Sequence, residues 1–172
     1  MRSRGEDLPN YDEFYPSGLI PINGTMPLSE FTQPNYVNKR GEKATPVFKN
    51  GLGTGTTVGG LNPLPSFVRF APEHGMESGN VSLATGVLPF GKSNNGFARC
   101  NGSTKRVSSR SFSEQGDSGA LILNGGGRIV ALLIAGAGSS EGTDITYGTP
   151  YCEVEQQIKE AYPGYRPYPT SA

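Results

Sequence analysis

The run RIVALLIAG, residues 128–136, restricts the fold of this chain more than any other segment. It is almost wholly apolar, is shorter than a typical helix and ends in glycine, which fits a buried strand. With 25 glycines and 14 prolines in 172 residues, the chain favours many short strands and turns over helices. We therefore predict an all-β barrel or sandwich of six or seven strands. Its other predicted strands are residues 47–51, 54–62, 66–70, 80–88, 119–124 and 145–150.

The segments around these strands predict an arm, a loop and a closing helix. Residues 1–46 are rich in proline, glycine, asparagine and charge, which predicts an extended arm with at most one short strand. Residues 89–110 predict a long polar loop. Beyond residue 150, apolar residues recur at helical spacing until Pro163 and Gly164 end the pattern: Val154, Ile158 and Ala161. The predicted division is an arm (1–46), a β-barrel with its helix (47–162) and a loose tail (163–172).

Charge and composition narrow the classes of function. Basic and acidic residues balance at 15 each, so composition points to neither a nucleic-acid nor an anionic-membrane partner. No apolar run approaches the roughly 20 residues of a membrane span, and the N-terminus does not resemble a signal peptide, which leaves the compartment open. The two cysteines, Cys100 and Cys152, are interpreted as free thiols, with a single disulfide bridge between them as the alternative in an oxidising compartment. Cysteine and histidine are not at metal-ligand spacing, and we expect neither metal nor cofactor.

The tetrapeptide GDSG, residues 116–119, carries the most chemistry. A nucleophilic serine must be exposed on a sharp turn, with backbone N–H groups directed at the developing oxyanion. Glycines on both sides of Asp117 and Ser118 allow such a turn and let a substrate come close. The alternative interpretation is a hairpin turn with a polar tip. The other glycine-rich stretches, GTGTTVGG and GAGSSEG, lack what a P-loop or a dinucleotide site requires.

The context of GDSG resembles a known protease lobe. SFSEQGDSGALIL (111–123), followed by GRIVALLIAG (127–136) and TYGTP (146–150), is similar to the C-terminal lobe of chymotrypsin-like (trypsin-fold, peptidase S1-type) serine proteases. A second segment, 47–62, is similar to the K-x-G-x-x-T-G-x-T-x-G pattern that opens the second barrel in one branch of this family, with Leu52 where that branch usually has arginine. The matching positions are Lys49, Gly51, Thr54, Gly55, Thr57 and Gly59.

The resemblance implies a role for each matched residue and a six-stranded second barrel with a C-terminal helix. Ser118 would be the nucleophile, the N–H groups of Gly116 and Ser118 the oxyanion hole, and Asp117 the brace of the loop. Two further groups would bind the substrate, the pocket floor and the cleft strand: Ser111, Phe112 and Ser113, and Ile134, Ala135 and Gly136 within residues 134–138. The floor has no obvious acid, so a preference for lysine or arginine is not implied.

The family's catalytic histidine and aspartate lie in an N-terminal barrel, and their counterparts are missing here. No histidine precedes Lys49, and 46 residues are too few for a six-stranded barrel. The single histidine, His74, lies in the stretch APEHGMESGN and is interpreted as a solvated loop residue, with a substrate contact or the general base as alternatives. Asp7 and Asp12 lack the apolar strand that follows the family's aspartate, so neither is assigned a role.

Three hypotheses remain. The chain is a fragment of a serine endopeptidase, inactive alone, whose partners are a peptide or protein substrate and a missing N-terminal barrel. Alternatively, it is a pseudoprotease that binds peptides without catalysis, or a structural β-domain with a chance GDSG. In the first two cases a lone lobe would expose an apolar patch, part of which residues 1–46 could cover.

Overall fold

The computed structural model describes residues 20–34, 36–37, 43–69, 81–89, 97–100, 103–106, 111–138 and 144–166, with backbone alone for 69, 97–100 and 103–106. Its elements, in chain order, are the 3₁₀ helix η1 (Leu28–Glu30), β1 (Tyr36–Val37), β2 (Lys43–Gly51), β3 (Gly55–Arg69), β4 (Val81–Pro89), β5 (Phe97–Cys100), β6 (Ser103–Arg106), β7 (Leu121–Asn124), β8 (Ile129–Ala137), β9 (Ile145–Pro150) and the helix α2 (Tyr151–Ala161).

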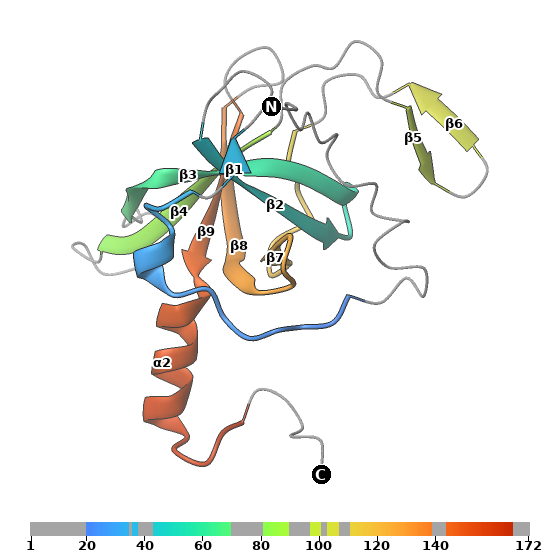
Figure 1. Ribbon diagram of the computed structural model, residues 1–172. Coiled ribbons are helices and arrows are strands. Elements are labelled where there is room, and N and C mark those ends of the chain that lie inside the picture. The colour runs from blue at the N-terminus through green and yellow to red at the C-terminus, as the bar shows by residue number, and fades with distance from the viewer. Residues whose placement is uncertain are drawn as a thin grey trace, which may run out of the picture.

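Six strands form a closed antiparallel barrel, in the order β2-β3-β4-β9-β8-β7 (Figure 1). The ring closes where β2 pairs with β7, with Phe48 opposite Leu123. Closure removes the unpaired strand edges that an open sheet would expose. The predicted all-β fold with a closing helix is therefore confirmed, as a barrel and not a sandwich. The short strand β1 pairs with β2 outside the ring.

The barrel interior is built from alternate residues of each strand, because side chains along a strand point to opposite faces. In β2 the buried positions are Thr45, Val47 and Lys49, so one inward position holds a charged residue. In β9 the buried residues are Thr146, Gly148 and Pro150. The hydrophobic core joins residues from the strands, the arm and the loop before β7: Met26, Phe31, Val47, Leu61, Val87, Phe112, Ile122, Val130, Ala131 and Leu133.

The described part of the arm, residues 20–34, runs beneath the barrel and passes beside the start of α2 (Figure 1). Its backbone pairs with β8: the Met26 N–H donates to the Ile129 carbonyl at 2.8 Å, and the Ile129 N–H to the Gly24 carbonyl at 2.9 Å. Two side-chain contacts also hold the arm. Arg128 forms a salt bridge with Glu30, and the Thr25 hydroxyl donates a hydrogen bond to Glu155. The arm is therefore part of the folded unit and supplies two core side chains.

Two sequence predictions about strands differ from the structure. The predicted strands 54–62 and 66–70 form one strand, β3, whose register against β4 shifts between Leu61 and Pro65. A proline cannot donate a hydrogen bond to the ladder, and the irregularity lies where the prolines lie. Residues 89–110 were predicted to be a loop throughout, which is wrong, because β5 and β6 pair within them as an antiparallel hairpin.

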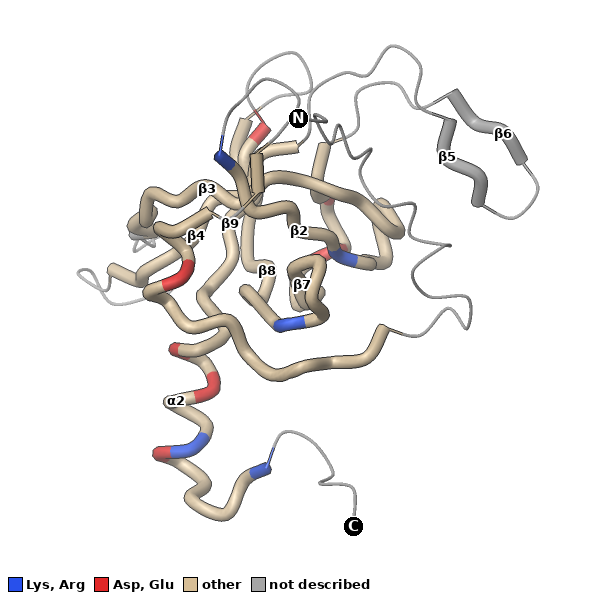
Figure 2. The backbone as a smooth tube through the Cα atoms, in the orientation of Figure 1, with Lys and Arg blue, Asp and Glu red and all other residues tan. Residues whose placement is uncertain are grey.

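Helix α2 begins directly after Pro150 and ends at Ala161, as the periodicity predicts. Val154 and Ile158 are half-buried, whereas Ala161 is exposed, so the apolar face is shorter than predicted. Charged residues gather along this helix and are sparse over the described barrel strands (Figure 2). Among the described residues, no helix has the length and apolar character needed to cross a membrane.

Gly59 tests how tightly the barrel is packed. A Cβ there would lie 2.7 Å from the Leu88 carbonyl oxygen and 2.8 Å from atoms of both Val87 and Phe112. We expect Gly59→Ala to lower the free energy of unfolding by about 1–3 kcal/mol, the usual effect of overpacking, in a urea titration. Gly125→Ala is the control, because its Cβ would meet nothing within 4 Å. Equal midpoints for the two variants would contradict the packing.

Candidate functional site

The GDSG loop makes two tight turns just before β7. Gly116 and Gly119 have φ values of 99° and 86°, which only glycine adopts without strain. The Asp117 N–H donates to the Glu114 carbonyl at 3.1 Å, and the Ala120 N–H to the Asp117 carbonyl at 3.0 Å. As a result, the side chain of Asp117 is buried while its neighbour Ser118 is exposed.

The Asp117 carboxylate accepts hydrogen bonds from three separate parts of the chain. Lys49 Nζ lies 2.7 Å from Oδ2, and both side chains are fully buried. The backbone N–H of Gly53, at 2.7 Å, and both the N–H and the hydroxyl of Thr54, at 3.2 and 2.7 Å, bind from the β2–β3 turn. The Glu114 N–H adds a bond of 3.1 Å from within the loop. Every oxygen of the buried carboxylate is therefore satisfied.

These contacts decide the ionisation of Asp117. Burial by itself raises the pKa of the carboxyl group, because it penalises the charged form. The hydrogen bonds from Lys49 and Thr54, followed by those from the backbone N–H groups of Glu114 and Thr54, outweigh this and hold the pKa far below its ordinary value. Asp117 is therefore ionised in the folded protein, and the pair with Lys49 is a true ion pair.

Lys49 is a residue of the candidate site to which the sequence analysis gave no role. Its Nζ also donates to the Thr54 hydroxyl and, at 3.3 Å, to the Gly55 carbonyl. It lies 5.9 Å from the centre of the Phe112 ring, which allows a cation–π contact. One signal could have revealed it, its place in the inward-pointing row with Thr45 and Val47.

The glycines beside Lys49 are required by how closely the β2–β3 turn approaches the loop. A Cβ at Gly51 would overlap the Asp117 carboxylate, and one at Gly53 would lie 2.7 Å from the Gln115 carbonyl oxygen. The spacing K-x-G-x-G therefore has a physical reason in this chain. Because residues 51 and 53 have no side chain, the backbone of the turn can approach the buried Asp117 carboxylate.

The hydroxyl of Ser118 and two nearby backbone N–H groups are unpaired in the described part of the chain. Among the described residues, neither the Ser118 hydroxyl nor the backbone N–H groups of Gly116 and Ser118 have a hydrogen-bond partner. The next N–H, from Gly119, instead donates to the Leu133 carbonyl at 2.8 Å and ties the loop to β8. The described ranges contain no histidine. His74, Asp7 and Asp12 all lie outside them.

The three residues predicted to form the floor of a specificity pocket differ in their burial and in their contacts. Phe112 is buried in the core, and both polar groups of its backbone are already paired. Its N–H donates to Asp144 Oδ2 at 3.0 Å, and its carbonyl accepts from the Thr57 hydroxyl at 2.7 Å. The Ser113 hydroxyl is 2.6 Å from that of Thr146. A Cβ at Gly136 would lie 3.6 Å from Ser113 Oγ, so these two predicted residues are close neighbours. Asp144 and Thr146 were not foreseen.

The remaining floor residue, Ser111, contacts a neighbouring acid. Its hydroxyl donates to the exposed Glu114 carboxylate at 3.2 Å. This contact directs Glu114 toward Ser111 and not toward the buried Asp117 carboxylate.

The strand predicted to border a cleft has one open edge. β8 pairs with β7 no further along than Leu132, whereas its pairing with β9 continues to Ala137. Within the described residues, Ile134, Ala135 and Gly136 therefore have a strand neighbour on the β9 side alone. A register shift against β9 lies between Leu133 and Ala135, at the bulged Ile134.

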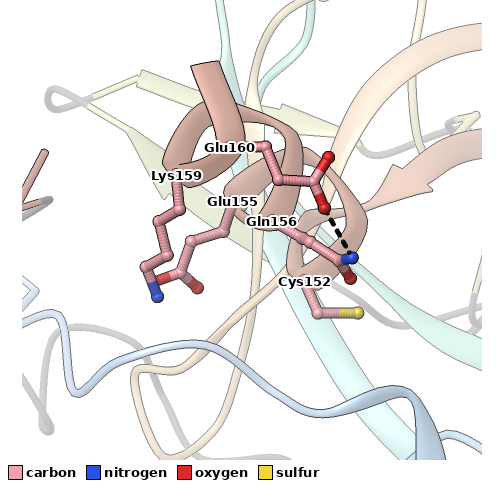
Figure 3. A pocket seen from close by; sticks show the side chains of 5 residues that line it. All are labelled: Cys152, Glu155, Gln156, Lys159 and Glu160. Carbon is pink, nitrogen blue, oxygen red and sulfur yellow. Dashed lines mark hydrogen bonds and ion pairs between the residues drawn. The ribbon is translucent and has the colours of Figure 1, made fainter. Parts of the chain in front are cut away.

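A hollow on α2 is a second place, besides the GDSG loop, to consider as a ligand site (Figure 3). It is lined by Cys152, Glu155, Gln156, Lys159 and Glu160. Its polar groups are already paired, Lys159 with Glu155 at 2.7 Å and Gln156 with Glu160 at 2.9 Å. Cys152 is a free thiol, and burial, followed by the charge of Glu153, raises its pKa, which disfavours the reactive thiolate. The hollow therefore offers little to a ligand.

Comparison with known proteins adds no assignment: no protein-family model matches this chain, and no curated protein matches its sequence.

Lys49→Met tests the ion pair by stability. Removing one partner of a buried pair leaves an uncompensated charge, and we expect a loss of about 3–5 kcal/mol in the free energy of unfolding. Lys159→Met is the control, since it removes an exposed pair on α2 worth about 0.5 kcal/mol. The double variant Lys49→Met/Asp117→Asn should recover part of the loss. A Lys49→Met protein as stable as the wild type would refute the pair.

The acid dependence of stability follows from the pKa of Asp117. Its folded pKa is below the unfolded value of about 3.9, so its contribution is complete above that pH and is lost as the pH falls toward the folded pKa. We expect the unfolding free energy of the wild type to fall below about pH 4, by up to about 1.4 kcal/mol per pH unit from this group. Lys49→Met/Asp117→Asn should have a shallower slope in urea titrations between pH 2 and 5. An unchanged slope would contradict the assignment.

Proposed function

We propose that this barrel is the nucleophile-bearing half of a chymotrypsin-like serine endopeptidase. The observation that carries the proposal is the contrast between adjacent residues of one loop. Asp117 is buried and bound by five hydrogen bonds, while Ser118 is exposed between two left-handed glycines with its hydroxyl unpartnered within the described residues. A rigid turn that presents one free hydroxyl is what a nucleophile needs.

The backbone N–H groups of Gly116 and Ser118 support the same role. Neither has a partner among the described residues, and they flank Asp117, which holds the backbone in place. In acyl transfer such donors stabilise the negative charge on the carbonyl oxygen of the tetrahedral intermediate. In this proposal Ser118 Oγ attacks the scissile carbonyl, and the two N–H groups bind its oxygen.

The open edge of β8 would hold the acyl side of the peptide. An extended peptide can add to an unpaired strand edge through main-chain hydrogen bonds, and residues 134–137 present such an edge close to the loop. Ser113 and Gly136 would form the wall beside the residue before the scissile bond, with the buried Thr146 behind Ser113. The Ser113 hydroxyl there suits a small or polar side chain.

The proton of Ser118 needs an acceptor, and the described residues contain no histidine that could take it. In the proposed mechanism a histidine takes that proton and later gives it to the leaving amine. The base would come from an N-terminal barrel outside this chain, or else from His74. Without it, loss of the triad costs on the order of a million-fold in rate, so the chain would bind and orient a peptide but cleave it poorly.

A second function, peptide binding without hydrolysis, is favoured by one specific observation. The β8 edge is open beside a loop that has no histidine near it among the described residues. A pseudoprotease of this kind would keep the binding edge and leave Ser118 unreactive.

Labelling with a fluorophosphonate separates these functions. The reagent phosphonylates an activated serine and releases fluoride, so we expect slow labelling of the folded protein at Ser118, located by mass spectrometry, and none in Ser118→Ala. Ser29→Ala, which removes an exposed serine of η1, should be labelled like the wild type. Labelling should also fall in Lys49→Met, because its loop is no longer held. A folded protein that reacts no faster than its urea-unfolded form would reject the nucleophile and favour the peptide-binding module.

A further inference from the structure

Leu52 is the most exposed large hydrophobic residue of the described surface, at 92%. It lies at the tip of the turn that joins β2 to β3. Single exposed leucines are common and need no explanation by themselves. This one differs because of what lies on either side of it.

The turn cannot withdraw Leu52 from solvent, because the neighbouring residues are fastened to the nucleophile loop. The Gly53 N–H binds Asp117 Oδ1 at 2.7 Å, and Thr54 binds the same carboxylate with two groups. Lys49 fixes the other flank through its bond to Asp117. The leucine is therefore held out on a short, rigid support, as a contact residue for a ligand would be.

The loop lies between this turn and β8. At one end, the Gly119 N–H bonds to Leu133 of β8. At the other, the place a Cβ would take on Gly116 is 3.8 Å from the Gly53 nitrogen. Ser118 lies in the chain between Gly116 and Gly119. A peptide that pairs with β8 and has a carbonyl at Ser118 would therefore continue toward the β2–β3 turn.

We infer that Leu52 contacts the leaving-group side of a bound peptide and selects an apolar side chain directly after the scissile bond. This inference rests on the proposed function, because that function sets the direction of the peptide. It adds a substrate class: peptides in which a leucine-like residue follows the cleaved bond. Leu52 would act in specificity and not in the chemical step.

Peptide α-ketoamides test the role of Leu52. They bind Ser118 reversibly, so their affinity is an equilibrium quantity that can be measured even if the chain lacks the general base needed for turnover. Ser118 Oγ adds to the ketone carbon, the C=O electron pair moves to the ketone oxygen, and that oxygen takes the serine proton, so no group leaves. The probes are three acetyl-Ala-Ala-Ala ketoamides, labelled with ¹³C at the ketone and continued by leucine, glycine or aspartate. The ¹³C shift of the ketone carbon reports the hemiketal, and titration gives each Kd.

We expect the leucine probe to bind about five- to tenfold more tightly than the glycine and aspartate probes, as partial burial of one apolar side chain allows. Leu52→Ala should reduce that preference to about twofold or less, and Leu52→Lys should favour aspartate. Leu64→Ala is the matched control, because Leu64 is also exposed, at 69%, but lies on β3 away from this turn.

The outcomes separate the two proposals. Adducts with all three probes at equal affinity, or a leucine preference that persists in Leu52→Ala, would overturn the role of Leu52 and leave the nucleophile intact. If no probe forms an adduct that Ser118→Ala abolishes, the proposed function fails, and the inference fails with it.

Discussion

A buried ion pair, Lys49 with Asp117, joins strand β2 to the loop before β7. Two charges withdrawn from water are tolerable only when their remaining hydrogen-bonding groups also find partners. Here Thr54 and the backbone of the β2–β3 turn supply them, and glycines at 51 and 53 make room for the approach. The shape of the loop, and thus the exposure of Ser118, follows from a contact made inside the barrel.

The arm and the barrel share one core, although the sequence suggests two separate parts. Met26 and Phe31 are buried among strand residues, and the backbone around Gly24 pairs with β8. The arm covers one end of the barrel, yet apolar side chains stay exposed elsewhere: Leu64 and Phe67 on β3 and Val81 on β4.

The sequence was most informative where apolar runs end at clear turn signals. β8, β9 and α2 were predicted within about a residue, because an apolar run bounded by glycine or proline has few other solutions. The pairing of β5 with β6 was missed, since the sequence of these strands is mostly polar and has no apolar alternation. Lys49 was matched to a pattern but given no function, because a lysine in an alternating strand normally points to solvent. Its partner lies 68 residues away, a separation that periodicity cannot detect.

That separation also has a kinetic consequence. The pairing of β2 with β7 and the Lys49–Asp117 contact are both non-local, and such contacts form slowly, because a long stretch of chain must be ordered before they contribute. The loop that carries Ser118 depends on them for its shape. A partly folded chain with an open sheet would therefore lack the arrangement around Ser118, which forms only when the barrel closes.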